Sequence, residues 1–394
     1  MKKLIYISLC ASLFFCSCEK SPVADNPGST DNEIIIPSGE YIHFNTEALT
    51  RGTLINGGTL QDKFDVIGYR YASDWGTFKV QARPNVFPRT VGNTTYDHVE
   101  TIKYNMVGGY HEYTDPVEWT ADNYAFFAYY PSSDADNVSI EASSSSYDGT
   151  PYITYTLPVA DITKHMDVMT ACNKDTRKQA SKHGVDLSMQ HRLSALDFVG
   201  YSYVNAEALN SMNTGNTEWE NLASDTPVQI EVEKLTITLG GLKYNKATIS
   251  LDETEDLVNG TAGVQSIVPS ATEGHDTTQE FTYIDAKSLS FDYGETAFLS
   301  NMLDDNASKE DEEGNPMILI PQSTPITCTV NITYSIKVNG VTIDKYTSTA
   351  EDEIKKLDEK VYNYVLLAFT KTGLYLKIEQ GTQWNEVNVG HQFE

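Results

Sequence analysis

The sequence has few of the residues that build disulfide frameworks. Only five cysteines occur in 394 residues, and just two of them, Cys172 and Cys328, lie beyond residue 18. Two cysteines are too few for a fold held together by disulfides. They either pair with each other or act as small buried apolar residues, and the sequence leaves both options open.

Patterns of catalytic and metal-binding residues are also missing. None of the eight histidines forms a His-x-x-x-His pair, and there is no Cys-x-x-Cys, no Gly-x-Ser-x-Gly elbow and no phosphate-binding loop. The acidic run at 304–313 lacks the spacing of an EF-hand calcium loop. His183 and His191 flank a predicted strand, where a structural hydrogen-bonding role is favoured over metal ligation. We therefore expect no enzyme activity, no metal and no cofactor.

Positive charge is scarce as well. The formal net charge is −27 at pH 7, from 28 Lys and Arg against 55 Asp and Glu. A surface this acidic repels the phosphate backbone of DNA or RNA. The composition therefore excludes nucleic acid as a partner.

Long apolar runs of the roughly 18 residues needed to span a membrane are absent too. The N-terminus instead has Lys2 and Lys3 before an apolar core at 4–15, the pattern of an export signal. Because the small Ser17 precedes Cys18, we predict a lipoprotein signal peptide at 1–17 and acyl chains such as palmitate on Cys18. These chains would anchor the protein in the outer membrane. An ordinary signal peptide cut nearby is the alternative.

The chain after Cys18 begins with a polar segment and a strand. Residues 18–40 are rich in Asn, Asp, Ser and Pro, which is typical of a flexible tether. Period-two alternation then predicts a strand over Tyr41–Thr50 with one apolar face. The residues that define this strand are Tyr41, Ile42, Phe44, Thr46 and Ala48.

A protease site follows this first strand. Thr50-Arg51-Gly52 lies between the strand and a Gly-rich turn, and proteases cut preferentially at such exposed connections. We expect a trypsin-like, Arg-specific protease to cut between Arg51 and Gly52. Arg83 and Arg89 are the competing sites.

Short strands separated by Gly, Asn, Ser and Pro clusters fill the rest of the chain, which predicts an all-β protein of antiparallel sandwiches. Residues 190–195 fit a short helical turn. The polar segment 205–227 predicts a linker between an N-terminal sandwich at 41–204 and a C-terminal sandwich at 228–394. The predicted strands are 64–71, 101–107, 124–130, 152–157, 185–189, 230–239, 247–251, 281–284, 317–320 and 328–338.

Several short motifs, in order along the mature chain, resemble those of the fimbrillin family, the subunits of type V pili. Each motif is short and degenerate, so the resemblance rests on their order. The motifs are Ile42-His-Phe44, Thr50-Arg51-Gly52, Phe64-Asp-Val66-Ile-Gly68-Tyr69, Trp119 with Tyr124-Ala-Phe-Phe-Ala-Tyr-Tyr-Pro131, His165-Met-Asp167-Val-Met169, Val185–Leu196, Leu239-Gly-Gly-Leu242 and Leu319-Ile-Pro321-Gln322.

This resemblance implies two tandem transthyretin-like sandwich domains and a route of assembly. Members of the family travel to the outer surface as lipoproteins, and an Arg-specific protease removes the first strand. The resemblance thus implies other fimbrial subunits as partners, because the uncovered sheet accepts a strand from a neighbour. Host glycans or proteins are further partners that an adhesin of this family would have.

The donor strand is expected at the C-terminal end of the chain. Two runs alternate there, one before and one after Gly381. Their apolar residues are Leu374, Leu376 and Ile378 in the first run, and Trp384, Val387 and Val389 in the second. The first run also fits the last core strand of the C-terminal sandwich, and this alternative stays open.

The sequence thus predicts a fimbrial subunit or tip adhesin, exported as an outer-membrane lipoprotein and assembled into a cell-surface fimbrium by strand exchange. Two alternatives differ in the fate of the first strand. One is a surface lipoprotein that binds glycans and never polymerises, and the other is an anchor subunit that keeps the strand.

Overall fold

The structure is a computed structural model. It describes residues 41–48, 63–78, 89–91, 94–96, 99–105, 110–113, 117–133, 139–143, 150–158, 162–177, 184–211, 221–254, 266–284, 288–300 and 316–379. Cys18, Arg51, Gly52, Trp384, Val387 and Val389 lie outside these residues, as do the predicted signal peptide and tether.

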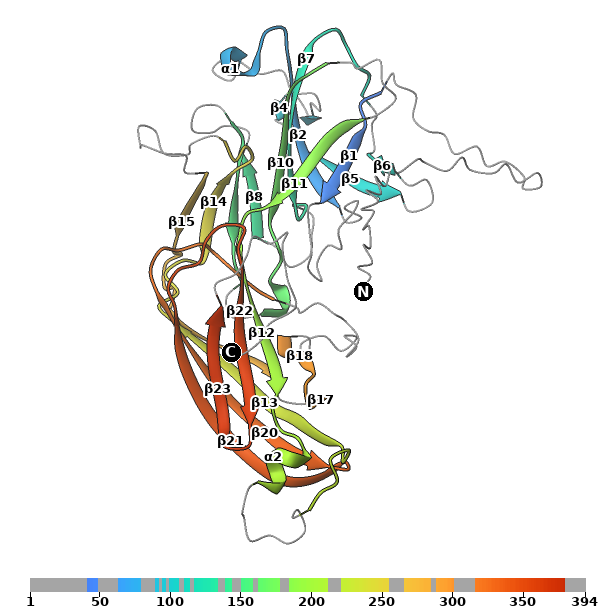
Figure 1. The fold of residues 1–394 in the computed structure, drawn as a ribbon. Coiled ribbons are helices and arrows are strands. Elements are labelled where there is room, and N and C mark those ends of the chain that lie inside the picture. Colours follow the sequence, from blue (N-terminus) through green and yellow to red (C-terminus); the bar gives the residue numbers. More distant parts are fainter. Residues whose placement is uncertain are drawn as a thin grey trace, which may run out of the picture. The chain divides into compact units, whose positions relative to one another are not determined.

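The described residues form an all-β protein, as the sequence predicts. Strands make up almost all of the regular structure (Figure 1). The helices described are short: α1 (Trp75–Phe78), η2 (Ile162–Lys164) and α2 (Ala206–Asn210). Asn205 caps α2, because its side chain accepts a hydrogen bond from the Ala208 amide at 2.7 Å.

A seven-stranded sheet holds the N-terminal part of the fold. Both faces of its central strand, β7, are buried, which explains why β7 reads as a continuous apolar run rather than as an alternation. The strands, in spatial order, are β1 (Phe44–Ala48), β11 (Val185–His191), β10 (Met169–Thr176), β7 (Asn123–Tyr130), β2 (Phe64–Tyr71), β5 (Val99–Asn105) and β6 (Tyr110–Glu112).

The two faces of this sheet contribute to different hydrophobic cores. Phe126 on β7 belongs to a small core that includes Ile42 and Phe44, so β1 helps to build it. Phe127, on the opposite face, belongs to a second, larger core together with Ile153 and Ile249. Ile153 and Ile249 lie in a four-stranded sheet of order β15 (Ile267–Ser270), β14 (Lys246–Ser250), β9 (Tyr152–Thr156) and β8 (Ser139–Ser143), and β3 (Arg89–Val91) pairs with β4 (Thr94–Tyr96) separately.

Two further sheets form the C-terminal sandwich (Figure 1). Aromatic rings join them across the larger core: Phe198 lies 5.2 Å from Tyr283, and Phe369 lies 4.9 Å from Tyr334. One sheet has the order β18 (Thr296–Phe298), β12 (Ser194–Ser202), β22 (Tyr362–Thr370) and β23 (Gly373–Glu379), with β19 (Met317–Leu319) also on β12. The other has the order β16 (Thr278–Ile284), β13 (Val228–Gly240), β20 (Ile326–Val338) and β21 (Val341–Ile354), with β17 (Leu289–Asp292) also on β13.

Strand pairing crosses the predicted linker at 205–227. β12 precedes the linker, yet it pairs with β18, β19 and β22 beyond it. β9 likewise pairs with β14. The division into domains at 41–204 and 228–394 stays a prediction, and any such division has to allow for these shared sheets.

Two ladders depart from the antiparallel arrangement that the sequence predicts. β1 pairs with β11 in parallel, and β12 pairs with β22 in parallel. Alternation identifies a strand and its inner face but not the direction of its neighbour, because each strand presents its side chains in the same way to either kind of partner.

The predicted helical turn at 190–195 is wrong. β11 continues to His191 and β12 begins at Ser194, so that only Arg192 and Leu193 separate the two strands. Strands β21 and β22 were not anticipated either. β21 is half-exposed and polar, whereas β22 is buried on both faces, so neither shows a clear apolar alternation.

Arg192 explains why the chain turns between β11 and β12. Its side chain is 0% exposed, and its guanidinium donates to Thr170 Oγ1 at 2.8 Å, Ser250 O at 2.6 Å, Ser266 Oγ at 2.7 Å and Glu359 Oε1 at 2.7 Å. These acceptors lie on or beside β10, β14, β15 and β22. The buried arginine therefore links three of the sheets.

Candidate strand-exchange site

β1 forms the edge of the seven-stranded sheet and completes its smaller core. Five register pairs join β1 to β11, from Phe44 opposite Val185 to Ala48 opposite Met189. On the exposed face, Asn45 Nδ2 donates to Asp186 Oδ1 at 3.2 Å. We call the environment formed by β11, β6, Tyr113 and Val117 the β1 site.

The buried face of β1 carries most of its contact with the core. Ile42, Phe44 and Thr46 are 0%, 2% and 3% exposed. The Phe44 ring meets Phe126 edge-to-face at 5.2 Å, and Thr46 Oγ1 lies 3.3 Å from His111 Nε2 on β6. Burying two large apolar side chains contributes roughly 1.5–3 kcal/mol each, so β1 is a substantial part of this core.

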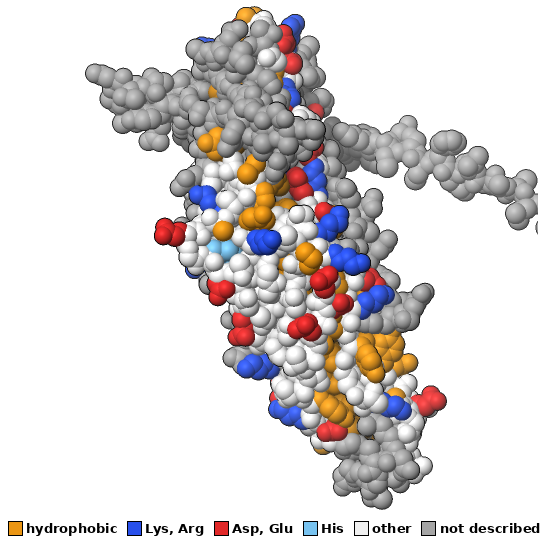
Figure 2. Space-filling model, turned by 90° about the vertical axis from the view of Figure 1, so that its left-hand side faces the viewer, with side chains coloured by type: hydrophobic (Ala, Val, Ile, Leu, Met, Phe, Trp, Pro, Cys, Tyr) orange, Lys and Arg blue, Asp and Glu red, His pale blue; other side chains and the backbone are white. Residues whose placement is uncertain are grey.

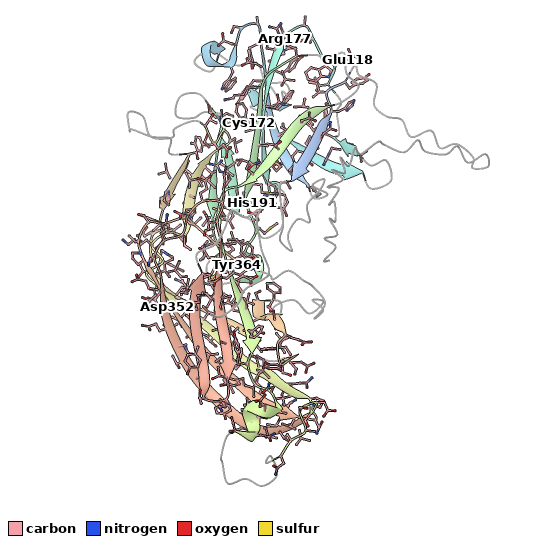
Figure 3. The ribbon with its side chains drawn as sticks, in the orientation of Figure 1. Glu118, Cys172, Arg177, His191, Asp352 and Tyr364 are labelled. Carbon is pink, nitrogen blue, oxygen red and sulfur yellow. The ribbon has the colours of Figure 1, made fainter. Side chains whose placement is uncertain are left out.

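The residues before β1 are held on the side opposite β11. The Ile42 amide donates to Val117 O at 2.8 Å, and Tyr113 Oη donates to Ile42 O at 3.0 Å. Tyr41 forms an isolated bridge with Glu118, which is labelled in Figure 3. β1 and the residues before it thus lie between β11 on one side and β6 with Tyr113 and Val117 on the other.

Gly184 allows β1 to approach β11 closely. The Val185 amide donates to His43 O at 2.6 Å. A Cβ atom at residue 184 would lie 2.5 Å from that same carbonyl oxygen and 2.7 Å from its carbon, well inside van der Waals contact. Glycine is therefore required here by space, because only a residue without a side chain fits against the backbone.

The structure brings the predicted first-strand residues together at this site. Ile42, Phe44 and Thr46 are buried. The strand begins at Phe44 and not at the predicted Tyr41, and Leu49 and Thr50 lie outside the described residues. Alternation missed the partners of β1. Gly184, His111 and Tyr113 are distant from β1 in sequence, and no pattern in the sequence pointed to them.

The predicted donor residues do not share one environment. Leu374, Leu376 and Ile378 lie in β23, which pairs with β22, and they are half-buried against the larger core. The first run of the tail is thus the last strand of the C-terminal sandwich in this structure, which was the alternative that the sequence left open.

A histidine and two aromatic residues outside the β1 site are buried inside the fold. His191, labelled in Figure 3, is buried, and its Nδ1 makes a hydrogen-bond contact with Asp167 Oδ2. The aromatic residues Tyr71 and Trp75 are 4% and 3% exposed and pack beside Tyr69 and Phe127. They are core residues and do not offer a surface for stacking.

The two internal cysteines are free thiols and do not pair with each other. Burial raises the pKa of Cys172, labelled in Figure 3, to about 12, and Asp252 adds to the effect. Burial likewise raises the pKa of Cys328 to about 12. Both thiols are therefore protonated and unreactive at neutral pH.

Within the described residues, no group of three His, Cys, Asp or Glu side chains is placed to hold a metal ion. Among the same residues, no helix has the length and apolar character of a membrane span.

Comparison with known proteins agrees with the family resemblance. A family model described as fimbrillin-like matches residues 57–306. Similar solved structures include a fimbrial protein from Bacteroides vulgatus, with 16% identity, a TM-score of 0.47, and 87% of this chain and 100% of that chain covered. A fimbrial assembly protein from Parabacteroides distasonis has 13% identity and a TM-score of 0.28, covering 86% of this chain and 96% of that chain. A comparison with curated proteins found no match.

The fold and the β1 site define a β-sandwich protein whose first strand completes its own core. The chain belongs to the fimbrillin-like family, since the match spans well over half of its length. Membership of this family implies a location at the cell surface and suggests other fimbrial subunits as partners.

Proposed function

We propose that the chain is a fimbrial subunit that is exported as a lipoprotein precursor and polymerises by strand exchange at the β1 site. Acylation at Cys18 tethers the precursor to the outer membrane. An Arg-specific, trypsin-like protease then cuts between Arg51 and Gly52, which severs the only covalent link between β1 and β2.

The observation that carries this proposal is that β1 is buried and is the first of the described strands. In the seven-stranded sheet β1 pairs only with β11, and the residues just before it bind Val117, Tyr113 and Glu118. After a cut between β1 and β2, only non-covalent contacts would hold β1 to the remaining described strands. Its departure would expose the β11 edge and uncover the core that Ile42 and Phe44 fill.

An extended segment from a neighbouring subunit can occupy the vacated position. A donor strand would restore the β11 ladder at about 1 kcal/mol net per hydrogen bond and refill the places of Ile42 and Phe44. We assign the donor role to the run with Trp384, Val387 and Val389. Leu374, Leu376 and Ile378 instead serve the C-terminal sandwich through β23.

Cleavage can be tested on the purified precursor by treatment with an Arg-specific protease and mass spectrometry of the new N-terminus. We expect a terminus at Gly52 and, after it, ladders of polymer that resist sodium dodecyl sulfate. Arg51→Gln should abolish both, whereas the control Arg89→Gln should change neither. A protein that polymerises fully as the Arg51→Gln variant would refute the proposed trigger.

The donor assignment has its own test. Val387→Asp combined with Val389→Asp places charges on apolar donor positions, so cleavage should proceed while ladders disappear. If this run binds as an extended strand, Asn388 would face away from Val387 and Val389, so Asn388→Asp should leave the ladders intact. Normal ladders from the double variant would show that the donor lies elsewhere.

A further inference from the structure

Large apolar side chains are rarely exposed in the described part of the chain. Only three are: Tyr293 at 52%, Val341 at 65% and Tyr375 at 59%. Val341 lies at the tip of the β20–β21 hairpin, next to the turn residue Gly340. The two tyrosines lie instead at one end of the sheet β18-β12-β22-β23.

The strand register places Tyr375 in line with Tyr201. Tyr201 pairs with Thr296 on β18 and with Ala368 on β22, and Ala368 pairs with Tyr375 on β23. Directly paired residues project to the same face of a sheet. Thr296, Tyr201, Ala368 and Tyr375 therefore form one row across four strands, with the small Ala368 between the two tyrosines.

The β17–β18 turn, which carries the second exposed tyrosine, Tyr293, lies close to this row. Gly294, next to Tyr293, donates its amide hydrogen to Ser202 O at 3.0 Å. A Cβ on Gly294 would lie 4.0 Å from Tyr201 Oη, and the rings of Tyr201 and Tyr203 are 4.6 Å apart. We call Tyr201, Tyr203, Tyr293 and Tyr375 the tyrosine band.

We propose that the tyrosine band binds a neutral oligosaccharide. A tyrosine offers a rigid apolar ring with a hydrogen-bonding hydroxyl at its tip, which matches a sugar's C–H faces and hydroxyl rim. Adjacent strands are about 4.8 Å apart, so Tyr201 and Tyr375, two strands apart, are about 10 Å apart, a span for more than one sugar unit.

The polar residues around the band suit a ligand rich in hydroxyl groups. Thr296 and Thr372 are exposed beside it, and Lys371 Nζ donates to Ser211 Oγ at the neighbouring turn. The net charge of −27 disfavours sialylated or sulfated glycans, so the ligand is uncharged. Figure 2 faces the flank where β21 and β23 lie and shows hydrophobic side chains grouped in its lower half beside polar and charged ones.

The size of the band favours a small ligand over a protein. A whole tyrosine side chain offers about 200 Å², so the exposed parts of Tyr293 and Tyr375 together offer about 220 Å². A specific protein interface buries on the order of 1,000 Å² or more. The proposed site is independent of strand exchange, since it involves neither β1 nor the residues after Glu379.

The test uses the whole mature chain on an array of neutral oligosaccharides built from glucose, galactose, mannose and N-acetylhexosamines, followed by calorimetry with the strongest binder. We expect Tyr375→Ala and Tyr293→Ala each to weaken binding at least tenfold. Tyr375→Phe keeps the ring and should stay within about threefold of the parent. Val341→Ala is the matched control, because it removes the third exposed apolar side chain away from the band, and it should leave affinity unchanged.

Three outcomes would overturn the proposal. One is the absence of binding to any neutral glycan on the array. Another is binding that both tyrosine variants retain in full. The third is a loss of self-association in Tyr375→Ala by analytical ultracentrifugation, which would assign the band to contact between copies of the chain.

Discussion

At the scale of the residue, single buried polar groups decide how the sheets are joined. Arg192 is the main example, since its guanidinium reaches Thr170, Ser250, Ser266 and Glu359 from a position with no solvent exposure. Hydrogen bonds to a buried charge are strong, and the acceptors lose them all when the charge is removed. Stability should therefore depend on this one side chain.

Arg192→Met should destabilise the protein by about 3 kcal/mol, at the low end for a broken buried pair because Glu359 is partly exposed. The measurement is the midpoint of urea unfolding. Lys356→Met is the control: it removes an exposed ion pair with Asp358 and should cost about 0–1 kcal/mol. Equal losses in the two variants would contradict the role given to Arg192.

A second residue-scale prediction concerns acid. Burial by itself would raise the pKa of Asp252, but hydrogen bonds from Lys174 and Thr254 outweigh it and hold that pKa below the ordinary 3.8. The contribution of Asp252 to stability is thus fully present above about pH 3.8, and it is lost as the pH falls through the lower folded-state pKa.

Asp252→Asn should therefore show a smaller loss of stability than the parent between pH 5 and pH 2. The measurement is the free energy of urea unfolding at both pH values. An Asp252→Asn curve parallel to that of the parent would contradict the assignment.

At the scale of the element, β1 depends on close backbone contact as much as on its apolar face. Gly184 leaves room for the His43 carbonyl, and Ile42 and Phe44 then reach the core. A strand at the edge, with a backbone ladder to one neighbour only, is also the element most easily released from a sheet. Close contact at Gly184 thus holds β1 in place, and its edge position lets it leave the sheet after cleavage.

Gly184→Ala should shift β1 and lower stability by about 1–3 kcal/mol, as overpacking does. It should also speed cleavage by an Arg-specific protease, because a loosened β1 exposes its connection to β2. Gly240→Ala is the control, since a Cβ there would meet only ordinary contacts at 3.8 Å. Unchanged cleavage in Gly184→Ala would show that β1 fits differently.

At the scale of the whole molecule, the smaller core is complete only while some strand occupies the β1 site. The larger core contains none of the β1 side chains and should remain folded after cleavage. The cleaved subunit is therefore expected to keep its fold, at lower stability, with the β11 edge open to a partner.

A protein cut after Arg51 and truncated after Glu379 should regain stability when a synthetic peptide of residues 380–394 is added. At a hundredfold excess over the Kd, binding to the native state alone adds about 2.7 kcal/mol. The measurement is the thermal midpoint at rising peptide concentration, and a scrambled peptide is the control. An equal shift with both peptides would contradict specific occupation of the β1 site.

Local pattern in the sequence determined the all-β class, about half of the strand positions and the buried face of the first strand. Ile42, Phe44 and Thr46 could be assigned to one side because side-chain direction alternates along any strand. The family resemblance was likewise carried by short motifs such as Phe64–Tyr69. Each of these features depends on neighbours in the chain.

Only the tertiary structure decided which strands meet and what covers them. The parallel ladders, the links made by Arg192, the approach of His43 to Gly184 and the exposure of Tyr293 and Tyr375 all join residues far apart in sequence. Tyr71 and Trp75 are buried, and their own segment does not determine this, because burial is a property of the packed sheets. Contacts between residues far apart in sequence produce no periodic pattern in either segment. The partners of β1 therefore could not be predicted from the alternation of its residues.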